Sequence, residues 1–367
     1  MSRYYFFIGT TAELIKLFPV IEEFKRRKVA VKIIVTGQND LHGNELVQYL
    51  GIKEFDVVLH RGAINQSAAQ LFFWFVRTFF KSWALLKREF SSDDGEKTFL
   101  IVHGDTVSTV MGAMLGRLFH VAVVHLEAGL RSFNYLHPFP EEIDRVITSH
   151  LARYHFCPNQ WAVDNLAKRV GEKVNTQQNT LLDSLHIASR FSIGPELQRR
   201  LQGKPFFIFV IHRQENIYNK KLFTALLTSV LERTKSLRCV FILHEPTKAS
   251  LEKFGLMGIL EQNPSVVLSP RLPFFQFIPL LTRCEFIITD GGSNQEECSY
   301  IGKPCCILRK CTERTEGLNK NVVVSKNDLA TINHFIDSYR QYQYPTIDAA
   351  ARPSEIITEE LMSFGRQ

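Results

Sequence analysis

Short apolar runs that end in glycine or a polar residue recur along the chain and constrain its fold more than any other feature. The first run, YYFFI, is followed by a Gly-Thr-Thr turn and the amphipathic segment AELIKLFPVIEEF. Later runs are VAVKIIVTG, DVVL, TFLIVHG and VAVVHLEAG, mostly separated by segments with apolar residues at helical spacing. Because strands that alternate with helices pair in parallel, the sequence predicts an α/β fold with parallel sheets.

The pattern stops and then restarts, which predicts two domains within the 367 residues. A helical stretch around 141–170 and an irregular piece separate the first runs from FFIFVIH, CVFILH, SVVLS, EFIITDGG and KPCCILR. We therefore expect one Rossmann-like domain over 1–170 and a second over 171–351. The final segment, 352–367, has helical character, and we expect it to pack back on the first domain.

Charge and cysteine content narrow the class of partner. The formal net charge of +7 favours an anionic partner, but the basic residues are scattered and no nucleic-acid motif is present. The seven cysteines lack paired CxxC spacing, which indicates neither a zinc site nor a disulfide framework. With no signal-peptide pattern at the N-terminus, we expect a cytoplasmic protein that binds no metal ion and no nucleic acid.

The segment 71–90, LFFWFVRTFFKSWALLKREF, combines many aromatic residues with Arg77, Lys81, Lys87 and Arg88. It is too charged to span a bilayer. We expect a crossover helix packed on the sheet. The alternatives are a peripheral membrane contact and a surface for a protein partner.

Polar residues that follow the apolar runs form an acidic set. Ligands of open parallel sheets bind outside the carboxyl ends of the strands. The residues at or near such positions are Asp105 after LIVHG, Glu127 after VVHL, Glu141 and Glu142 in PFPEEIDR, and His212 after FFIFVI. Singly, each could be a helix cap or a solvated loop residue. Around one pocket, carboxylates and a histidine can remove a proton from one face of a substrate and donate one to the other.

The segment ITDGGSNQEE predicts a strand, a turn of small residues and a helix whose first backbone amides face that turn. A helix N-terminus attracts an anion by about 0.3–1 kcal/mol. We therefore expect Gly291, Gly292 and Ser293 to bind phosphate.

The chain resembles the non-hydrolysing UDP-N-acetylglucosamine 2-epimerases. The resemblance rests on motifs in the family's order and spacing: GTTAELIKLFPVI, VHGDT, HLEAGLRS, FPEEIDR, HRQEN, TDGGSNQEE, GKP and CTERTEG. It covers most of the chain. It implies a GT-B architecture, in which two Rossmann-like domains with parallel sheets face a central cleft, together with a homodimer and no cofactor.

The resemblance also implies roles for residues at matching positions. Asp105, Glu127 and Glu141 match the family's catalytic carboxylates, and His212 matches its active-site histidine. Phe277 matches the aromatic residue that packs on uracil. The full set expected to bind UDP or substrate is Lys16, Gln38, Arg145, Phe277, Gly291, Gly292, Ser293, Glu297 and Arg314.

The chain departs from the family pattern at several positions. Thr11 and Ala12 replace an Arg-Pro pair in the first loop, which removes a positive charge, and Asn39 replaces a histidine. The second-domain Ser-Gly-Gly is Gly-Gly-Ser at 291–293. The loop at 64–66 only partly matches the region that binds a second substrate molecule as an activator in bacterial members, which argues against such activation.

The implied activity is an isomerase that interconverts UDP-N-acetylglucosamine and UDP-N-acetylmannosamine, or a related UDP-2-acetamido sugar. UDP would be eliminated and added back, in a pathway to a surface polysaccharide such as capsule or lipopolysaccharide. The first alternative is a GT-B glycosyltransferase with a UDP-sugar donor, which the missing first-loop arginine and the 71–90 helix favour. The others are a hydrolysing epimerase that releases free N-acetylmannosamine, and a non-catalytic binding protein. The epimerase is preferred because a transferase has no evident need for all four acid–base residues.

Overall fold

The chain folds into two compact units. The computed structural model describes residues 2–61, 68–90, 96–136, 138–233, 236–312, 314–347 and 352–366. One unit comprises Met1–Ser184 with Ala349–Gln367, and the other comprises Leu185–Asp348. The first unit extends past residue 170, where we expected the boundary, because strand β7 (Glu172–Asn175) pairs with β6 (Tyr154–Cys157).

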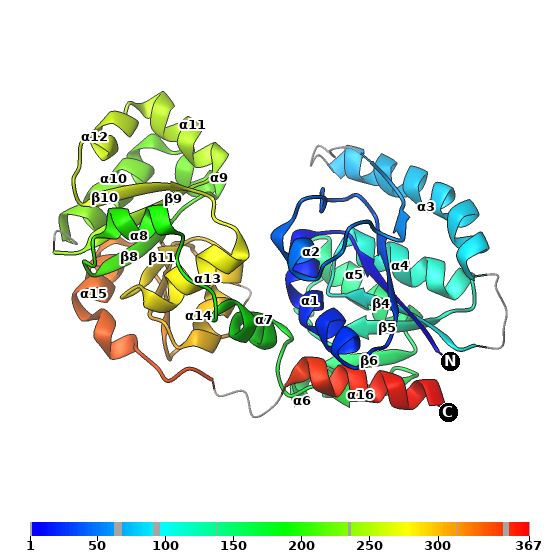
Figure 1. The fold of residues 1–367 in the computed structure, drawn as a ribbon. Helices are drawn as coiled ribbons and strands as arrows, with labels where there is room; N and C mark the ends of the chain where they lie inside the picture. Colours follow the sequence, from blue (N-terminus) through cyan, green and yellow to red (C-terminus); the bar gives the residue numbers. More distant parts are fainter. Residues whose placement is uncertain are drawn as a thin grey trace. The chain divides into compact units, whose positions relative to one another are not determined.

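The first unit contains a seven-stranded parallel sheet of order β3-β2-β1-β4-β5-β6-β7, of which β4, β5 and β6 are labelled in Figure 1. Its remaining strands are β1 (Arg3–Ile8), β2 (Val31–Val35), β3 (Val57–Val58), β4 (Thr98–His103) and β5 (Ala122–Leu126). Its helices include α1 (Thr11–Arg26), α2 (Glu45–Tyr49), α3 (Ala68–Phe90), α4 (Val107–Leu118), α5 (Glu141–Leu151) and α6 (Gln160–Asn165), and α7 (Leu181–Ala188) runs across the boundary. The order reverses between β1 and β4, which are neighbours, so this is a doubly wound fold.

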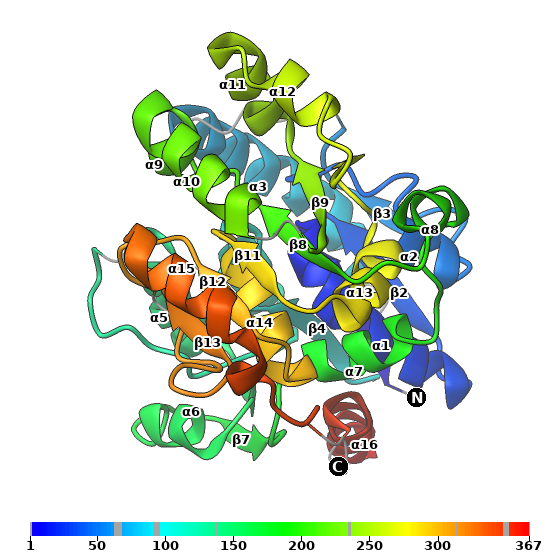
Figure 2. The same cartoon turned by 90° about the vertical axis from the view of Figure 1, so that its left-hand side faces the viewer.

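The second unit contains a six-stranded parallel sheet of order β10-β9-β8-β11-β12-β13, most of which can be followed in Figure 2. Its strands are β8 (Phe206–Val210), β9 (Arg238–Leu243), β10 (Val266–Pro270), β11 (Ile287–Thr289), β12 (Cys305–Ile307) and β13 (Val322–Val324). Its helices include α8 (Pro195–Leu201), α9 (Gln214–Ile217), α10 (Lys220–Arg233), α11 (Glu245–Phe254), α12 (Met257–Glu261), α13 (Phe274–Arg283), α14 (Gly292–Ile301) and α15 (Leu329–Ser338), followed by the 3-10 turn Tyr339–Tyr342. The order reverses between β8 and β11, as it does between β1 and β4.

The C-terminal helix α16 (Pro353–Arg366) packs on the first unit near β6 (Figure 1). Leu361 is fully buried. Lys97 Nζ donates a hydrogen bond to the Phe364 carbonyl at 2.8 Å, and the Phe364 ring stacks on Tyr154 with centroids 4.5 Å apart. These contacts join the last residues of the chain to the strands of its first half.

Three short strands were missed in the sequence. The stretch 141–170, expected to be helical, contains α5, then β6 and then α6, and the irregular piece contains β7. The third missed strand is β13. All four residues of β6 (YHFC) are buried, so the strand has no polar face and no period-two pattern. Strands of this kind are assigned by their neighbours in the sheet and not by their own sequence.

Helix α3 packs on the sheet of the first unit, as a crossover helix should. Trp74 and Leu86 belong to the same buried cluster as side chains of β1 and β4. The opposite face exposes aromatic rings: Phe72 is 63% exposed, and Phe73 and Phe80 are each 70% exposed. Within the described ranges, no helix has the length and apolar character needed to cross a bilayer.

Glycine lets α4 approach the sheet closely at the point where the strand order reverses, which generates a stability prediction. A Cβ at Gly112 would lie 2.7 Å from both Phe7 Cδ1 and Val102 Cγ1, which belong to fully buried side chains. Gly112→Ala should therefore lower the free energy of unfolding by about 1–3 kcal/mol, because overpacking outweighs the better helix propensity of alanine. Urea denaturation followed by circular dichroism measures the change.

Gly258 provides a matched control, since it also lies in a helix but has nothing within 4 Å of the added Cβ. Gly258→Ala should leave the free energy of unfolding unchanged or raise it by up to about 1 kcal/mol. Equal midpoints for the two variants would contradict the close packing of α4.

Candidate active site

Asp105 lies at the carboxyl edge of the first sheet, in the turn that joins β4 to α4. Gly104 makes this turn with a φ of +69°, and Thr106 caps α4 by accepting a hydrogen bond from the Thr109 amide. Arg145 of α5 donates to Asp105 Oδ2 from Nε at 2.9 Å and from Nη2 at 2.5 Å. Both donors bind the same oxygen, and this ion pair orients the Asp105 carboxylate, which is 29% exposed.

Glu127 follows β5 with a φ of +59°, a left-handed conformation that is uncommon for a residue with a Cβ. Lys16 Nζ and Asn179 Nδ2 each donate to its Oε1 at 2.6 Å. His103 Nε2 lies 3.6 Å from Oε2, and burial lowers the pKa of this histidine to about 4, so its ring is neutral near pH 7. Backbone strain of about 1–3 kcal/mol at a polar strand end is typical of functional sites.

The adjacent acids Glu141 and Glu142 in the first turn of α5 have different environments. Glu142 accepts hydrogen bonds from Arg131 Nε at 2.6 Å and from the amides of Ser132 and Phe133 at 2.9 and 3.2 Å. Burial by itself would raise the pKa of Glu142. These hydrogen bonds outweigh burial, so the pKa lies below its usual value. Glu141 is half-buried, and its Oε2 has no hydrogen-bond partner in the described part of the chain. Glu142 therefore holds the 131–133 loop, whereas Glu141 remains available for chemistry.

Gln38 lies at the carboxyl end of β2, where Ser108 Oγ donates to its Oε1 at 2.6 Å. Its neighbour Asn39 accepts a hydrogen bond from the Thr11 amide through Oδ1 at 3.1 Å. Two departures from the family pattern are thus in direct contact in the first unit. The departure at 64–66 lies outside the described residues.

In the second unit, Asp290 directly follows β11 and organises the loop after β8. It is fully buried and accepts hydrogen bonds from the amides of His212 and Arg213, at 3.0 and 2.9 Å, and from Asn216 Nδ2 at 3.0 Å. His212 Nδ1 lies 3.0 Å from Asp290 Oδ1, and the His212 ring stacks on His244 with centroids 4.6 Å apart. The predicted active-site histidine is therefore fixed by a carboxylate and by a second ring.

The N-terminus of α14 also lies at this edge of the second sheet. Gly291 is its N-cap, and a Cβ at Gly292 would lie 3.3 Å from Arg314 Nε, so this guanidinium lies against the first turn of the helix. Arg314 Nη1 also donates to Glu296 Oε2 at 2.6 Å. Backbone amides and a guanidinium side by side can hold a phosphate.

The other predicted binding residues of the second unit have these positions. Ser293 is exposed in the first turn of α14. Glu297 is buried on the same helix, and its Oε2 accepts a hydrogen bond from Asn294 Nδ2 at 2.9 Å. Phe277 is half-buried on α13. The structure thus gathers His212, Gly292 and Arg314 at the carboxyl ends of β8, β11 and β12.

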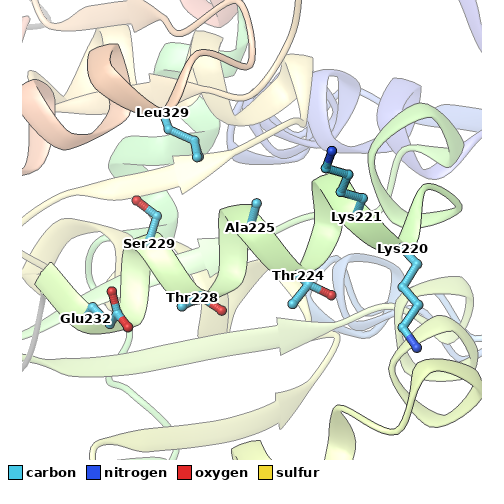
Figure 3. Close-up of a pocket in the computed structure, with 8 residues that line it drawn as sticks. All are labelled: Lys220, Lys221, Thr224, Ala225, Thr228, Ser229, Glu232 and Leu329. Atoms are coloured by element: carbon cyan, nitrogen blue, oxygen red, sulfur yellow. The ribbon is translucent and has the colours of Figure 1, made fainter.

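Two pockets lie within single units. The larger, about 730 Å³, runs along α10 and is lined by residues that include Thr224, Ser229 and Leu329 (Figure 3). None of the predicted site residues lines it. The smaller, about 540 Å³, lies at the ends of β2 and β3, and the residues on both sides of Gln38 line it. The described residues contain no group of three His, Cys, Asp or Glu side chains that could hold a metal ion.

Two polar residues of these clusters were missed in the sequence. Asp290 directly follows β11, so the rule that selected the other strand-end acids could have found it. Asn179 gave no such signal, because it follows β7, a strand that was itself missed in the sequence. Asn179 lies 52 positions from Glu127 in the sequence, so only the fold reveals their contact.

Two doubly wound units in one chain, each with polar residues and a helix N-terminus at the point of strand reversal, define a nucleotide-binding protein of the GT-B type. The sequence matches the family described as UDP-N-acetylglucosamine 2-epimerase over residues 22–353. The chain belongs to this family.

Individual relatives agree with this assignment. The UDP-N-acetylglucosamine 2-epimerase of Methanococcus maripaludis is 29% identical, covering 92% of this chain and 93% of that protein. The UDP-2,3-diacetamido-2,3-dideoxy-D-glucuronate 2-epimerase of Pseudomonas aeruginosa is 30% identical, covering 84% of each. The Neisseria meningitidis UDP-GlcNAc 2-epimerase, crystallised with UDP-GlcNAc, has the same fold, with a TM-score of 0.80, 24% identity and coverage of 99% of this chain and 100% of that one.

The contacts of Asp290 generate a prediction of stability with a defined pH dependence. Burial by itself would raise the pKa of Asp290. Hydrogen bonds from His212, the Arg213 amide and Asn216 outweigh burial, so the pKa lies below its usual value. The ionised carboxylate therefore stabilises the fold above its unfolded pKa of about 3.9, and this contribution is lost as the pH falls through the folded value. Asp290→Asn should lower the free energy of unfolding at pH 7 by about 3 kcal/mol, since a buried charged partner is removed.

Guanidinium denaturation at pH 7 and pH 3.5 measures this effect, and the difference between Asp290→Asn and the parent should shrink at the lower pH. Asp328→Asn is the control, because Asp328 caps α15 at an exposed position where asparagine serves as well. A loss for Asp290→Asn that is the same at both pH values would rule out the ionised carboxylate as its cause.

Proposed function

We propose that this chain is an isomerase that inverts carbon 2 of a UDP-2-acetamido sugar. The observation that carries the proposal is the pair of fixed carboxylates after β4 and β5. Asp105 is held by Arg145, and Glu127 is held in a strained conformation by Lys16 and Asn179. Two carboxylates after neighbouring strands suit a reaction in which one group removes a proton and another returns one.

The reaction we propose is elimination followed by addition. A carboxylate takes the proton from carbon 2, and the bond between carbon 1 and the diphosphate oxygen breaks, so that its electron pair leaves with UDP. A double bond forms between carbons 1 and 2, giving a 2-acetamidoglucal. UDP then adds back at carbon 1 while carbon 2 receives a proton on its other face. Asp105, Glu127 and Glu141 are the proposed acid–base groups.

Negative charge develops on UDP as it leaves, and we propose that the second unit binds it. The amides at the start of α14 and the guanidinium of Arg314 provide positive potential for the diphosphate. His212, held by Asp290, supplies a further donor. Phe277 and Glu297 are proposed to contact the uracil and the ribose.

The sugar that the chain accepts is part of the proposal. The relatives include enzymes named for UDP-N-acetylglucosamine and one named for a diacetamido glucuronate. We propose UDP-N-acetylglucosamine as the substrate, with UDP-2,3-diacetamido-2,3-dideoxy-D-glucuronate as the comparison. Use of the product in surface polysaccharide synthesis stays a prediction.

The deciding experiment follows each UDP-sugar with the purified protein in deuterated water by proton NMR. We expect deuterium at carbon 2 and the appearance of the 2-epimer, because the proton that returns comes from an exchangeable carboxyl group. Release of free sugar would instead identify a hydrolysing enzyme. An inert donor that turns over only with an added glycan or lipid acceptor would identify a glycosyltransferase.

Substitution of the fixed carboxylates tests their roles. Asp105→Asn and Glu127→Gln should each lower kcat by at least about 100-fold, since each removes a proposed acid–base group. Glu196→Gln serves as the control, because Glu196 is exposed and pairs with Arg199 on its own helix. Near-normal rates for both site variants would remove these carboxylates from the mechanism.

A homodimer, a cytoplasmic location and peripheral membrane contact also stay predictions. The exposed rings of α3 support either a dimer or a membrane contact, because apolar surface of this kind is usually covered by a partner or a lipid surface. Phe72→Ser with Phe80→Ser should reduce the sedimenting mass if a second copy covers this face, or reduce binding to anionic vesicles if lipid does. If neither measurement changes, α3 serves neither purpose.

A further inference from the structure

The first turn of α5 contains a third acid, Asp144, that the mechanism does not use. Asp144 is only 8% exposed, and its Oδ2 is buried with no hydrogen-bond partner among the described residues. Glu141 lies three residues earlier on the same helix, so the two side chains share one face. The structure therefore holds two neighbouring carboxyl groups that each keep a buried oxygen without a donor.

Two of the carboxylates near Asp144 already have compensating positive charges. Asp105 is paired with Arg145 at 2.5 Å, and Glu142 takes the donors of the 131–133 loop. No described donor is directed at Asp144. A buried carboxylate without a donor is far more costly than a buried neutral carboxyl group.

We propose that the buried carboxyl group of Asp144 carries a proton at neutral pH and so keeps a further negative charge away from Glu141, a proposed acid–base group; this inference rests on the function proposed above. Asp144 carries the proton because its side chain is buried and its Oδ2 has no hydrogen-bond donor among the described residues.

The charges near Asp144 agree with this assignment. Burial, and then the negative charges of Asp105 and Glu141, raise the pKa of Asp144 to about 7. The packed helix α4 has one charged residue, Arg117, in its last turn, and it does not act on Asp144. On the neighbouring strand β5, His125 Nε2 donates a hydrogen bond to the Gly104 carbonyl, and the ring is uncharged near pH 7, since burial lowers its pKa to about 3.

The sign of the pH effect follows from the raised value. Below about pH 7, Asp144 is neutral and adds no charge beside Glu141. Above about pH 7, an unpaired negative charge appears on Asp144 beside Glu141. A substrate with a diphosphate would then meet added repulsion, so kcat/KM should fall as the pH rises.

The test compares kcat/KM for epimerisation in the parent and in Asp144→Asn from pH 6 to 9. The parent should lose about tenfold between pH 6.5 and 8.5, whereas the variant, which stays neutral, should lose less than about twofold. At pH 6 the two rates should agree within about threefold, because both side chains are then uncharged. The same alkaline decrease in both proteins would overturn the proposal.

Asp183→Asn is the matched control, because Asp183 is equally buried and its pKa is also raised by burial, but its Oδ2 accepts a hydrogen bond from the Ser354 amide away from the cluster. This variant should keep the alkaline decrease of the parent. If kcat/KM of Asp183→Asn no longer fell at alkaline pH, substitution of any buried aspartate would remove the pH dependence. That result would contradict a role specific to Asp144.

A second measurement needs no turnover and separates this inference from the proposed function. In protein labelled with ¹³C at the aspartate carboxyl carbons, one resonance should titrate near pH 7, be absent from Asp144→Asn and be retained in Asp183→Asn. No titration between pH 6 and 8 in the parent would overturn the inference even if Asp144→Asn fails to fold. Such a titration in a protein that turns over neither UDP-sugar would contradict the proposed function alone.

Discussion

The reversal of strand order in each parallel sheet is the constraint on which the rest of the structure depends. β1 and β4 are hydrogen-bonded neighbours, and so are β8 and β11, but the chain leaves the two members of each pair toward opposite sides. The loops after such strands diverge, so polar side chains and helix N-termini stay accessible there instead of being covered by a crossing connection. Asp105 and Asp290 both occupy the turn that follows the fourth strand of their sheet. The backbone pairing of the sheets therefore decides where chemistry can occur.

Donors decide what each carboxylate at these edges can do. Glu142 and Asp290 are each held by several N–H groups, which stabilise the ionised form and make these residues structural supports for a loop and a histidine. Glu127 accepts hydrogen bonds from Lys16 and Asn179, and a strained backbone directs its side chain. Asp144 has a buried oxygen with no donor in the described chain. The same chemical group can thus be an anchor, a base or a proton carrier, depending on what surrounds it.

Most of the regular structure could be predicted because its pattern is local. The apolar runs that became β1, β4, β5, β8 and β9 are long enough to be seen without a partner, and the helices between them have clear periodicity. The strands β6, β7 and β13 were missed because their residues show no alternation of polar and apolar side chains, and only their pairing with neighbouring strands defines them. The same limit applies to the end of the first unit, which depends on the pairing of β7 with β6.

The sequence by itself determined the alternation of strands and helices, and with it the rule that places polar residues at strand ends. Asp105, Glu127 and His212 could be chosen in this way because their positions depend only on where a nearby strand ends. The tertiary structure alone decided the partner of each group. Arg145 reaches Asp105 across 40 residues and Lys16 reaches Glu127 across 111, while the burial of Asp144 depends on the packing of α5 against α4. Charge and solvation depend on distance in space and not along the chain, so the protonation state of this site is a property of the fold.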